Sequence, residues 1–148
     1  MKKPLFFKIG AVLLLSTLVG HADIPADQPL PMPTYGFNLG NSLEAVWGYA
    51  YPAQAVFTTA ASEGFNAVRI PCAWNDNADP VTYQIDPVFM AKVKQTVDYA
   101  IAAGMYVVVN DHWDNGWLES NIGSTVDPTI DAMMASYWTR SLRLTGRN

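Results

Sequence analysis

The sequence predicts an α/β fold with parallel strands, and two observations carry this prediction. Three short apolar runs typical of strands alternate with three segments of helical periodicity between residues 35 and 138, in the order β-α-β-α-β-α. The links between them are short, and this alternation favours parallel strands joined by right-handed crossovers. The third run, Tyr106–Val109, is nearly continuous and β-branched, which predicts a strand buried on both faces.

The first half of the fold follows from local signals. The first strand is expected at 35–39, and the first helix at 52–63, where Gly64 provides a C-terminal stop. The second strand is expected at 65–70. Pro71 is expected to break it, because proline cannot donate a ladder hydrogen bond.

The second half contains the clearest helix. Asp86 is expected to cap this helix, with Pro87 at its first position and Gly104 as its stop. The third strand is expected at 106–110, and a third helix at 127–138. The apolar face of that last helix is expected to pack in the core, and it consists of Ile130, Met133, Met134, Tyr137 and Trp138.

Residues 1–22 have the pattern of a secretory signal peptide. Lysines precede an apolar segment, Ile9–Val19, that is too short to span a bilayer, and cleavage is expected before Asp23. An uncleaved anchor is the alternative. Cleavage would leave six basic and thirteen acidic residues, a charge of −7. We therefore expect a secreted or periplasmic protein that binds neither nucleic acid nor, after cleavage, a membrane.

Both flanks of the domain differ from its centre. Residues 23–34 are rich in proline and are expected to form an extended lead-in. Residues 139–148 contain three arginines and no fourth strand, so we expect a truncation or frameshift after Trp138. Three strands cannot close a barrel, so residues 35–138 are either a small open sheet or the first part of a longer barrel.

Polar and aromatic side chains follow each predicted strand. The carboxyl ends of parallel strands meet at one edge of a sheet, where α/β proteins build their sites. Four of the five tryptophans fall there, which favours a surface for a flat polar ligand such as a sugar ring, with a large loop core as the alternative. We call these residues the strand-end rim and expect the following to bind substrate: Asn38, Asn41, Glu44, Trp47, Trp74, Trp113, Asp114 and Trp117.

Arg69 lies between Val68 and Ile70 inside the second strand. A buried guanidinium is costly without a partner, so a carboxylate is expected to face it. The pair would be either a structural ion pair or the means of orienting a catalytic carboxylate, and that partner could equally be encoded beyond Asn148.

No cofactor or metal is expected. His112 is the only histidine outside the signal segment, and one imidazole does not make a zinc site. The glycines of Gly36-x-Asn38-x-Gly40 lack the spacing of a dinucleotide loop. Cys72 is the only cysteine, so it cannot form an intramolecular disulfide, and it is expected to be a small buried hydrophobe.

Three ordered motifs resemble those of glycoside hydrolase family 5 cellulases. They are GFNLGNSLE at 36–44, FNAVRIP at 65–71 and NDHW at 110–113, and the resemblance covers about Tyr35 to Trp138. It implies a (β/α)8 barrel, of which about the first three βα units are present. The implied activity is endoglucanase hydrolysis of internal β-1,4-glucosidic bonds with retention and without metal.

The resemblance also implies roles for two residues. Arg69 matches the arginine that supports the nucleophilic carboxylate, and His112 matches the histidine that contacts the sugar at the cleaved bond. Trp113 stands where the family often has a second histidine. The family's two catalytic glutamates follow strands four and seven and have no counterpart here, so we expect the 148 residues alone to show no glucanase activity.

Other functions remain open on the sequence. One alternative is a non-catalytic secreted carbohydrate-binding protein, and another is a related β-mannanase or xyloglucanase. A third is a small exported α/β domain whose tryptophans are structural, and it would not be retarded in gels containing β-glucan.

Overall fold

The computed structural model describes residues 33–123, 125–141 and 144. The expected signal peptide, nearly all of the lead-in and most of the 139–148 tail lie outside these residues. In the described part of the chain, no helix is long and apolar enough to cross a bilayer.

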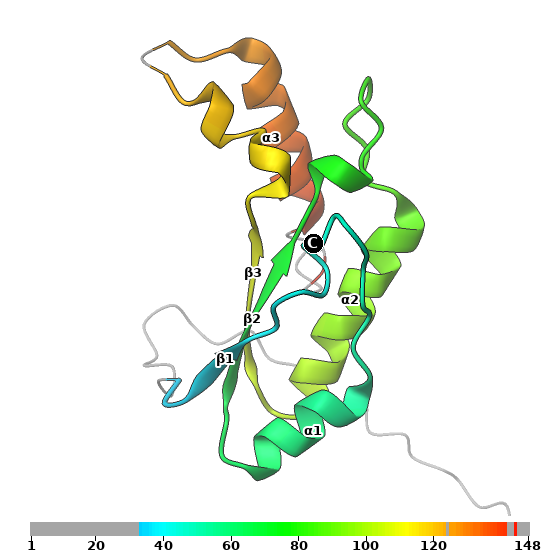
Figure 1. Ribbon diagram of the computed structural model, residues 1–148, viewed down its shortest axis with the longest axis vertical. Coiled ribbons are helices and arrows are strands. Elements are labelled where there is room, and N and C mark those ends of the chain that lie inside the picture. Colours follow the sequence, from blue (N-terminus) through cyan, green and yellow to red (C-terminus); the bar gives the residue numbers. More distant parts are fainter. Residues whose placement is uncertain (1–32, 124, 142–143, 145–148) are drawn as a thin grey trace, which may run out of the picture. The chain divides into compact units, whose positions relative to one another are not determined.

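The fold is a three-stranded parallel sheet with helices, as predicted (Figure 1). The strands are hydrogen-bonded in the order β1-β2-β3, and Arg69 of β2 is in register with Asn38 of β1 and Val108 of β3. The strands are β1 Gly36–Asn38, β2 Ala67–Cys72 and β3 Tyr106–Asp111, and the α-helices are α1 Gln54–Ser62, α2 Pro87–Ala102 and α3 Pro128–Ser141. Three short 3₁₀ helices lie in the loops: η1 Asn75–Asn77, η2 Asp114–Gly116 and η3 Glu119–Asn121.

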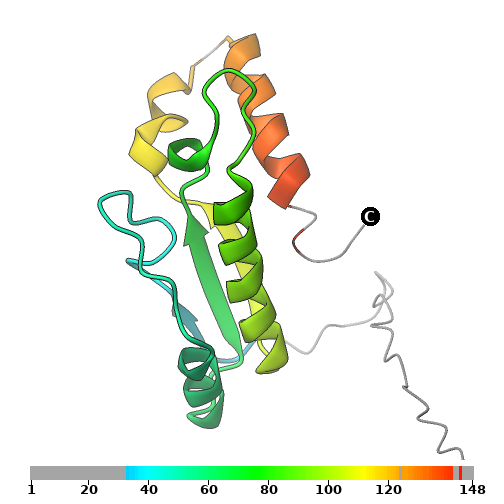
Figure 2. The ribbon, with the colours of Figure 1, turned by 90° about the vertical axis from the view of Figure 1, so that its right-hand side faces the viewer.

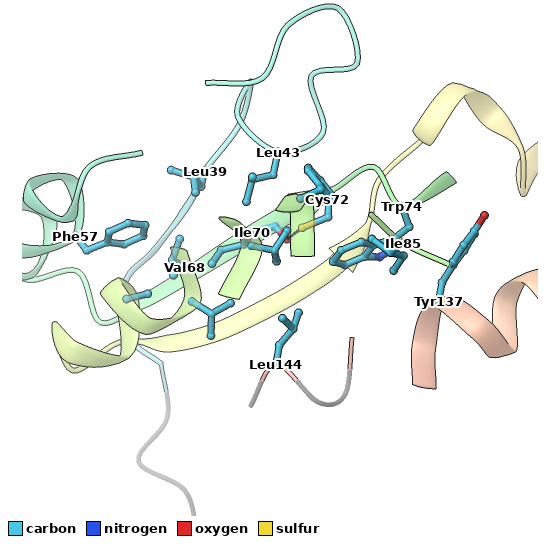
Figure 3. Close-up of a cluster of buried hydrophobic side chains, with 14 of the residues drawn as sticks. Leu39, Leu43, Phe57, Val68, Ile70, Cys72, Trp74, Ile85, Tyr137 and Leu144 are labelled. Carbon is cyan, nitrogen blue, oxygen red and sulfur yellow. Dashed lines mark hydrogen bonds between the residues drawn. The ribbon is translucent and has the colours of Figure 1, made fainter. Parts of the chain in front are cut away.

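The core lies on the face of the sheet that α1 and α2 cover (Figures 1 and 2). Alternate residues of β2, namely Val68, Ile70 and Cys72, point into it and are almost completely buried. Figure 3 shows these side chains beside Phe57 of α1 and Leu43 of the loop after β1. Cys72 is a free, buried thiol, as predicted, and burial raises its pKa.

The opposite face of the sheet is open, which corrects one prediction. We expected β3 to be buried on both faces, but Val108 is 59% exposed. Val108 is in register with Arg69, and both lie on the side away from the core, where they line a shallow groove of about 270 Å³. The apolar run therefore indicated a strand correctly, but in the described residues only one of its faces is covered.

Pro71 does not break β2, contrary to the prediction. The strand continues to Cys72, which pairs with Asp111. Leu39 N donates to Arg69 O on the β1 side of β2, and Ala73 N donates to Leu43 O on that same side. Pro71 lies between these two residues, so its missing N–H falls on the side where β1 has already ended, and no ladder bond is lost.

The helices follow their sequence signals with small shifts. The Asp86 carboxylate caps α2 by accepting from Val88 N (2.6 Å) and Phe89 N (3.0 Å), as predicted. Helix α1 begins at Gln54, two residues later than expected, and α3 continues to Ser141. Trp138 is 41% exposed and lies outside the core face that was predicted for α3.

Candidate functional site

Arg69, in the middle of β2, connects the end of β1 to the residue that directly follows β3. Its Nη1 donates to Asn38 Oδ1 over 2.6 Å, and its Nη2 lies 3.0 Å from His112 Nδ1. A Cβ at position 40 would lie 2.9 Å from Asn38 Nδ2, so Gly40 leaves room for this amide. Asn38, Arg69 and His112 therefore form one hydrogen-bonded wall, and the two residues with expected catalytic support roles, Arg69 and His112, are in direct contact.

The guanidinium determines how the His112 ring is used. Arginine can only donate, so Nδ1 of His112 must accept, and the ring proton is on Nε2. The imidazole consequently presents an N–H donor on its other edge. Donors of this kind can bind a sugar hydroxyl or ring oxygen.

No carboxylate faces Arg69 within the described residues, which corrects the expectation of a local acidic partner. Among the described residues, the ion pair that forms joins Lys94 to Asp98, both on α2. Arg69 is only half-buried and its charge is bound by an amide and an imidazole, so a carboxylate is not required to offset desolvation.

Two tryptophans of the strand-end rim are free to contact a ligand. Trp113, directly after His112, is 58% exposed, and Trp47 in the loop after β1 is 74% exposed. Asn38 and Asn41, which precede Trp47 in the chain, are also exposed and add amide groups. An indole face with nearby amides suits a pyranose ring, because C–H groups pack on the ring while hydroxyls bind the amides.

Trp74 and Trp117 are buried, so the expectation that their rings face substrate is wrong in this structure. Trp74 is 1% exposed and packs edge-on against Phe89 of α2, with centroids 6.1 Å apart. Trp117 is 8% exposed, packs edge-on against Tyr137 of α3, and donates from Nε1 to Asp111 Oδ2 over 3.1 Å. Residue type could not separate these rings from Trp47 and Trp113, because all four follow strands.

The expected ligand carboxylates, Glu44 and Asp114, are bound to backbone instead. Glu44 accepts from Asn41 N (2.7 Å) and Ser42 N (3.0 Å), so it shapes its own loop. Asp114 is 1% exposed and accepts from Asn75 N and Asp76 N, so it joins the loop after β3 to the loop after β2. Asp114 is therefore corrected from a substrate ligand to a structural anchor.

Sequence reasoning missed the role of Asp111 and of the Tyr49–Asp76 pair. Asp111 is half-buried, and burial raises its pKa. Tyr49 donates to Asp76 Oδ2 over 2.6 Å, and burial together with this bond raises the Tyr49 pKa. None of these three residues belongs to a periodic pattern, so only the three-dimensional packing identifies their roles.

Within residues 33–123, 125–141 and 144, no cluster of three His, Cys, Asp or Glu side chains could hold a metal ion. A larger cavity, about 740 Å³, lies beside Tyr51 and the start of α2 and includes neither Arg69 nor His112.

Comparison with known sequences places residues 29–142 in the profile of cellulase, glycosyl hydrolase family 5. A xyloglucan-specific endo-β-1,4-glucanase of Bacteroides ovatus is 31% identical over 134 residues, which are 80% of this chain and 26% of that protein. Endoglucanase B of Clostridium cellulovorans is 30% identical over 141 residues, covering 90% of this chain and 32% of that protein. The chain thus spans about a quarter to a third of these relatives.

Solved structures give the same match. A Bacteroides ovatus xyloglucanase in complex with an XXXG heptasaccharide aligns with a TM-score of 0.68 and 31% identity, over 77% of this chain and 28% of that one. A broad-specificity endoglucanase of Ruminococcus champanellensis with bound cellotriose aligns with a TM-score of 0.68 and 28% identity, over 78% of this chain and 38% of that one.

Proposed function

The chain belongs to the cellulase family, glycosyl hydrolase family 5, and from this premise we propose that it supplies one wall of a site for hydrolysis of β-1,4-glucan. Its fold is the (β/α)8 barrel of that family, represented by three consecutive βα units. The observation that carries the proposal is the contact of Arg69 of β2 with both Asn38, at the end of β1, and His112, directly after β3.

The proposed reaction is endo-hydrolysis with retention of configuration in an exported protein. Retention needs a protonated carboxyl for the leaving oxygen and a carboxylate about 5 to 5.5 Å away to attack the anomeric carbon. His112 would donate from Nε2 to the sugar at the cleaved bond, and Arg69 would hold His112 in that orientation. Trp113 and Trp47 would pack against neighbouring sugar rings, with Asn38 and Asn41 bonding to hydroxyls.

The carboxyls of the strand-end rim support assigning the acid and the nucleophile to residues outside these 148. Glu44 binds Asn41 N and Ser42 N, Asp76 binds Tyr49, and Asp114 binds Asn75 N and Asp76 N. Each is therefore committed to local structure. We expect the purified chain not to release reducing ends from carboxymethylcellulose, and turnover that is lost in His112→Ala would refute this assignment.

A carbohydrate-binding role without catalysis is the second candidate, favoured by this same engagement of the rim carboxyls. Either role requires saccharide contact at the rim. Xyloglucan and unsubstituted β-glucan are both candidate ligands, because the matches include a xyloglucan-specific endo-β-1,4-glucanase and an endoglucanase structure with bound cellotriose.

Affinity electrophoresis tests saccharide contact. The chain is expected to be retarded in gels containing xyloglucan or hydroxyethylcellulose, and Trp113→Ala is expected to abolish most of the retardation. Trp138→Ala is the matched control, because Trp138 is similarly exposed but lies on α3. Absence of retardation, or equal losses in both variants, would favour a domain whose tryptophans are only structural.

A further inference from the structure

The turn after β3 holds an unfavourable backbone conformation. Trp113 has φ 53° and ψ −53°, and Asp114 N donates to His112 O over 2.6 Å, which closes a γ-turn of the rare, strained hand. Asp114 and Asn115 follow with φ of 44° and 61°. Three consecutive non-glycine residues with positive φ cost about 1–3 kcal/mol each, so the surrounding structure must hold them in place.

The Asp114 carboxyl is the group that holds this turn. It is almost completely buried, and it accepts from Asp76 N over 3.0 Å and from Asn75 N on the neighbouring loop. Tyr137 of α3 donates to Asn75 Oδ1 over 3.1 Å, which fixes the loop from the other side. The Trp113 side chain is 58% exposed, so its position depends mainly on the turn that Asp114 holds.

Asp111 presents an acceptor that lacks a donor. Its Oδ2 accepts from Trp117 Nε1, but its Oδ1 is buried with no hydrogen-bond partner among the described residues. An unsatisfied buried oxygen costs about 1–3 kcal/mol. The neighbouring Asp114 carboxyl interacts directly with Asp111, and a proton on Asp114 would supply the missing donor while leaving acceptor capacity for both backbone N–H groups.

We propose that Asp111 and Asp114 share one proton and act as positioning residues that hold the γ-turn presenting Trp113. The pair touches no substrate in this scheme. The inference depends on the proposed function only for what Trp113 contacts, and the shared proton can be measured without any saccharide.

The surrounding charges support a shared proton. Burial, together with the charges of Asp111 and Asp76, raises the pKa of Asp114 to about 7, although the hydrogen bonds from the two backbone N–H groups lower it. The other titratable groups facing the pair are Asp76 from η1, Glu119 from η3, Tyr137 from α3 and Cys72 from β2. None of these groups in the described part of the chain is a cation, so no positive side chain among them offsets a second negative charge.

The sign of the pH dependence follows from the raised pKa. The folded state binds the proton more tightly than the unfolded chain, so the stability that it contributes is present at acidic pH and declines as pH rises through about 7. Above that pH two buried carboxylates repel each other, and the strained turn is expected to relax.

Carboxyl ¹³C NMR of the whole chain tests the proposal without a mutation. We expect Asp111 and Asp114 to titrate as a coupled pair, with the upper step near pH 7 and the Trp113 indole N–H resonance moving in the same step. Independent titration of both carboxyls below pH 5, or a Trp113 resonance that does not follow the upper step, would overturn it.

Two variants separate the shared proton from a merely structural effect. Asp114→Asn should remove the upper step, and Asp111→Asn, which keeps the bonds of Asp114 to Asn75 N and Asp76 N, should lower it by about one pH unit. Asp131→Asn on α3 is the control and should leave the step unchanged. A step that persists unaltered in Asp111→Asn contradicts sharing, whereas loss of saccharide binding with the step intact contradicts only the proposed function.

Discussion

Trp74→Ala is expected to lower the free energy of unfolding by about 3–5 kcal/mol, which is the usual cost of removing a large aromatic ring from a packed core. Trp74 is fully buried beside Ile85 and Phe89, so truncation leaves a cavity that the start of α2 cannot fill (Figure 3). Urea denaturation with linear extrapolation measures the change.

Trp113→Ala is the comparison that makes this result informative. Trp113 is mostly exposed, so its truncation should change stability by no more than about 0.5 kcal/mol. The two variants should therefore show opposite behaviour, with Trp74→Ala losing stability and Trp113→Ala losing saccharide affinity. Equal stability losses would mean that the division of the tryptophans into core and rim is wrong.

Arg69→Ala is expected to release the His112 ring and to weaken saccharide binding about tenfold, equivalent to about 1.4 kcal/mol. Without the guanidinium donor, no hydrogen bond from Arg69 favours the tautomer in which Nδ1 of His112 is the acceptor, so both ring tautomers should become populated. Two-dimensional ¹⁵N NMR of the imidazole measures the tautomers, and titration calorimetry with cellotetraose measures the affinity.

Arg69→Lys and Arg140→Ala are the controls for this prediction. Lysine keeps the charge but cannot bond Asn38 and His112 at once with a rigid fork, so it should restore little of the affinity. Arg140→Ala removes a charge from α3 and should leave both readouts unchanged. An unaltered tautomer in Arg69→Ala would show that other contacts orient the ring.

Most of the fold could be predicted because its signals are local. Asp86 and Pro87 specify the start of α2 through capping and a preset φ, and β-branched residues favour strands at β2 and β3. Pro71 was misjudged because its effect depends on which neighbour its missing N–H would face. That is a property of the sheet, determined by where β1 ends, and the residue itself does not reveal it.

The site was predictable only in part, for a similar reason. The positions of Arg69 inside β2 and of His112 and Trp113 directly after β3 follow from sequence order, and the structure brings Arg69 and His112 together. Whether the side chains of Trp117 and Asp114 face inward depends on the positive φ values of the turn after β3. The sequence Trp113-Asp114-Asn115 does not predict these φ values. The pairing of Asp111 with Asp114 depends on the same turn.

A titration of the isotope-labelled chain with cellotetraose, and separately with a xyloglucan heptasaccharide, tests saccharide contact at this rim most directly. The proposed site predicts that the largest chemical-shift changes occur at the Arg69 side chain, His112 and the Trp113 indole, with the Trp138 indole unaffected. Changes centred elsewhere, or no saturable change with either sugar, would contradict it.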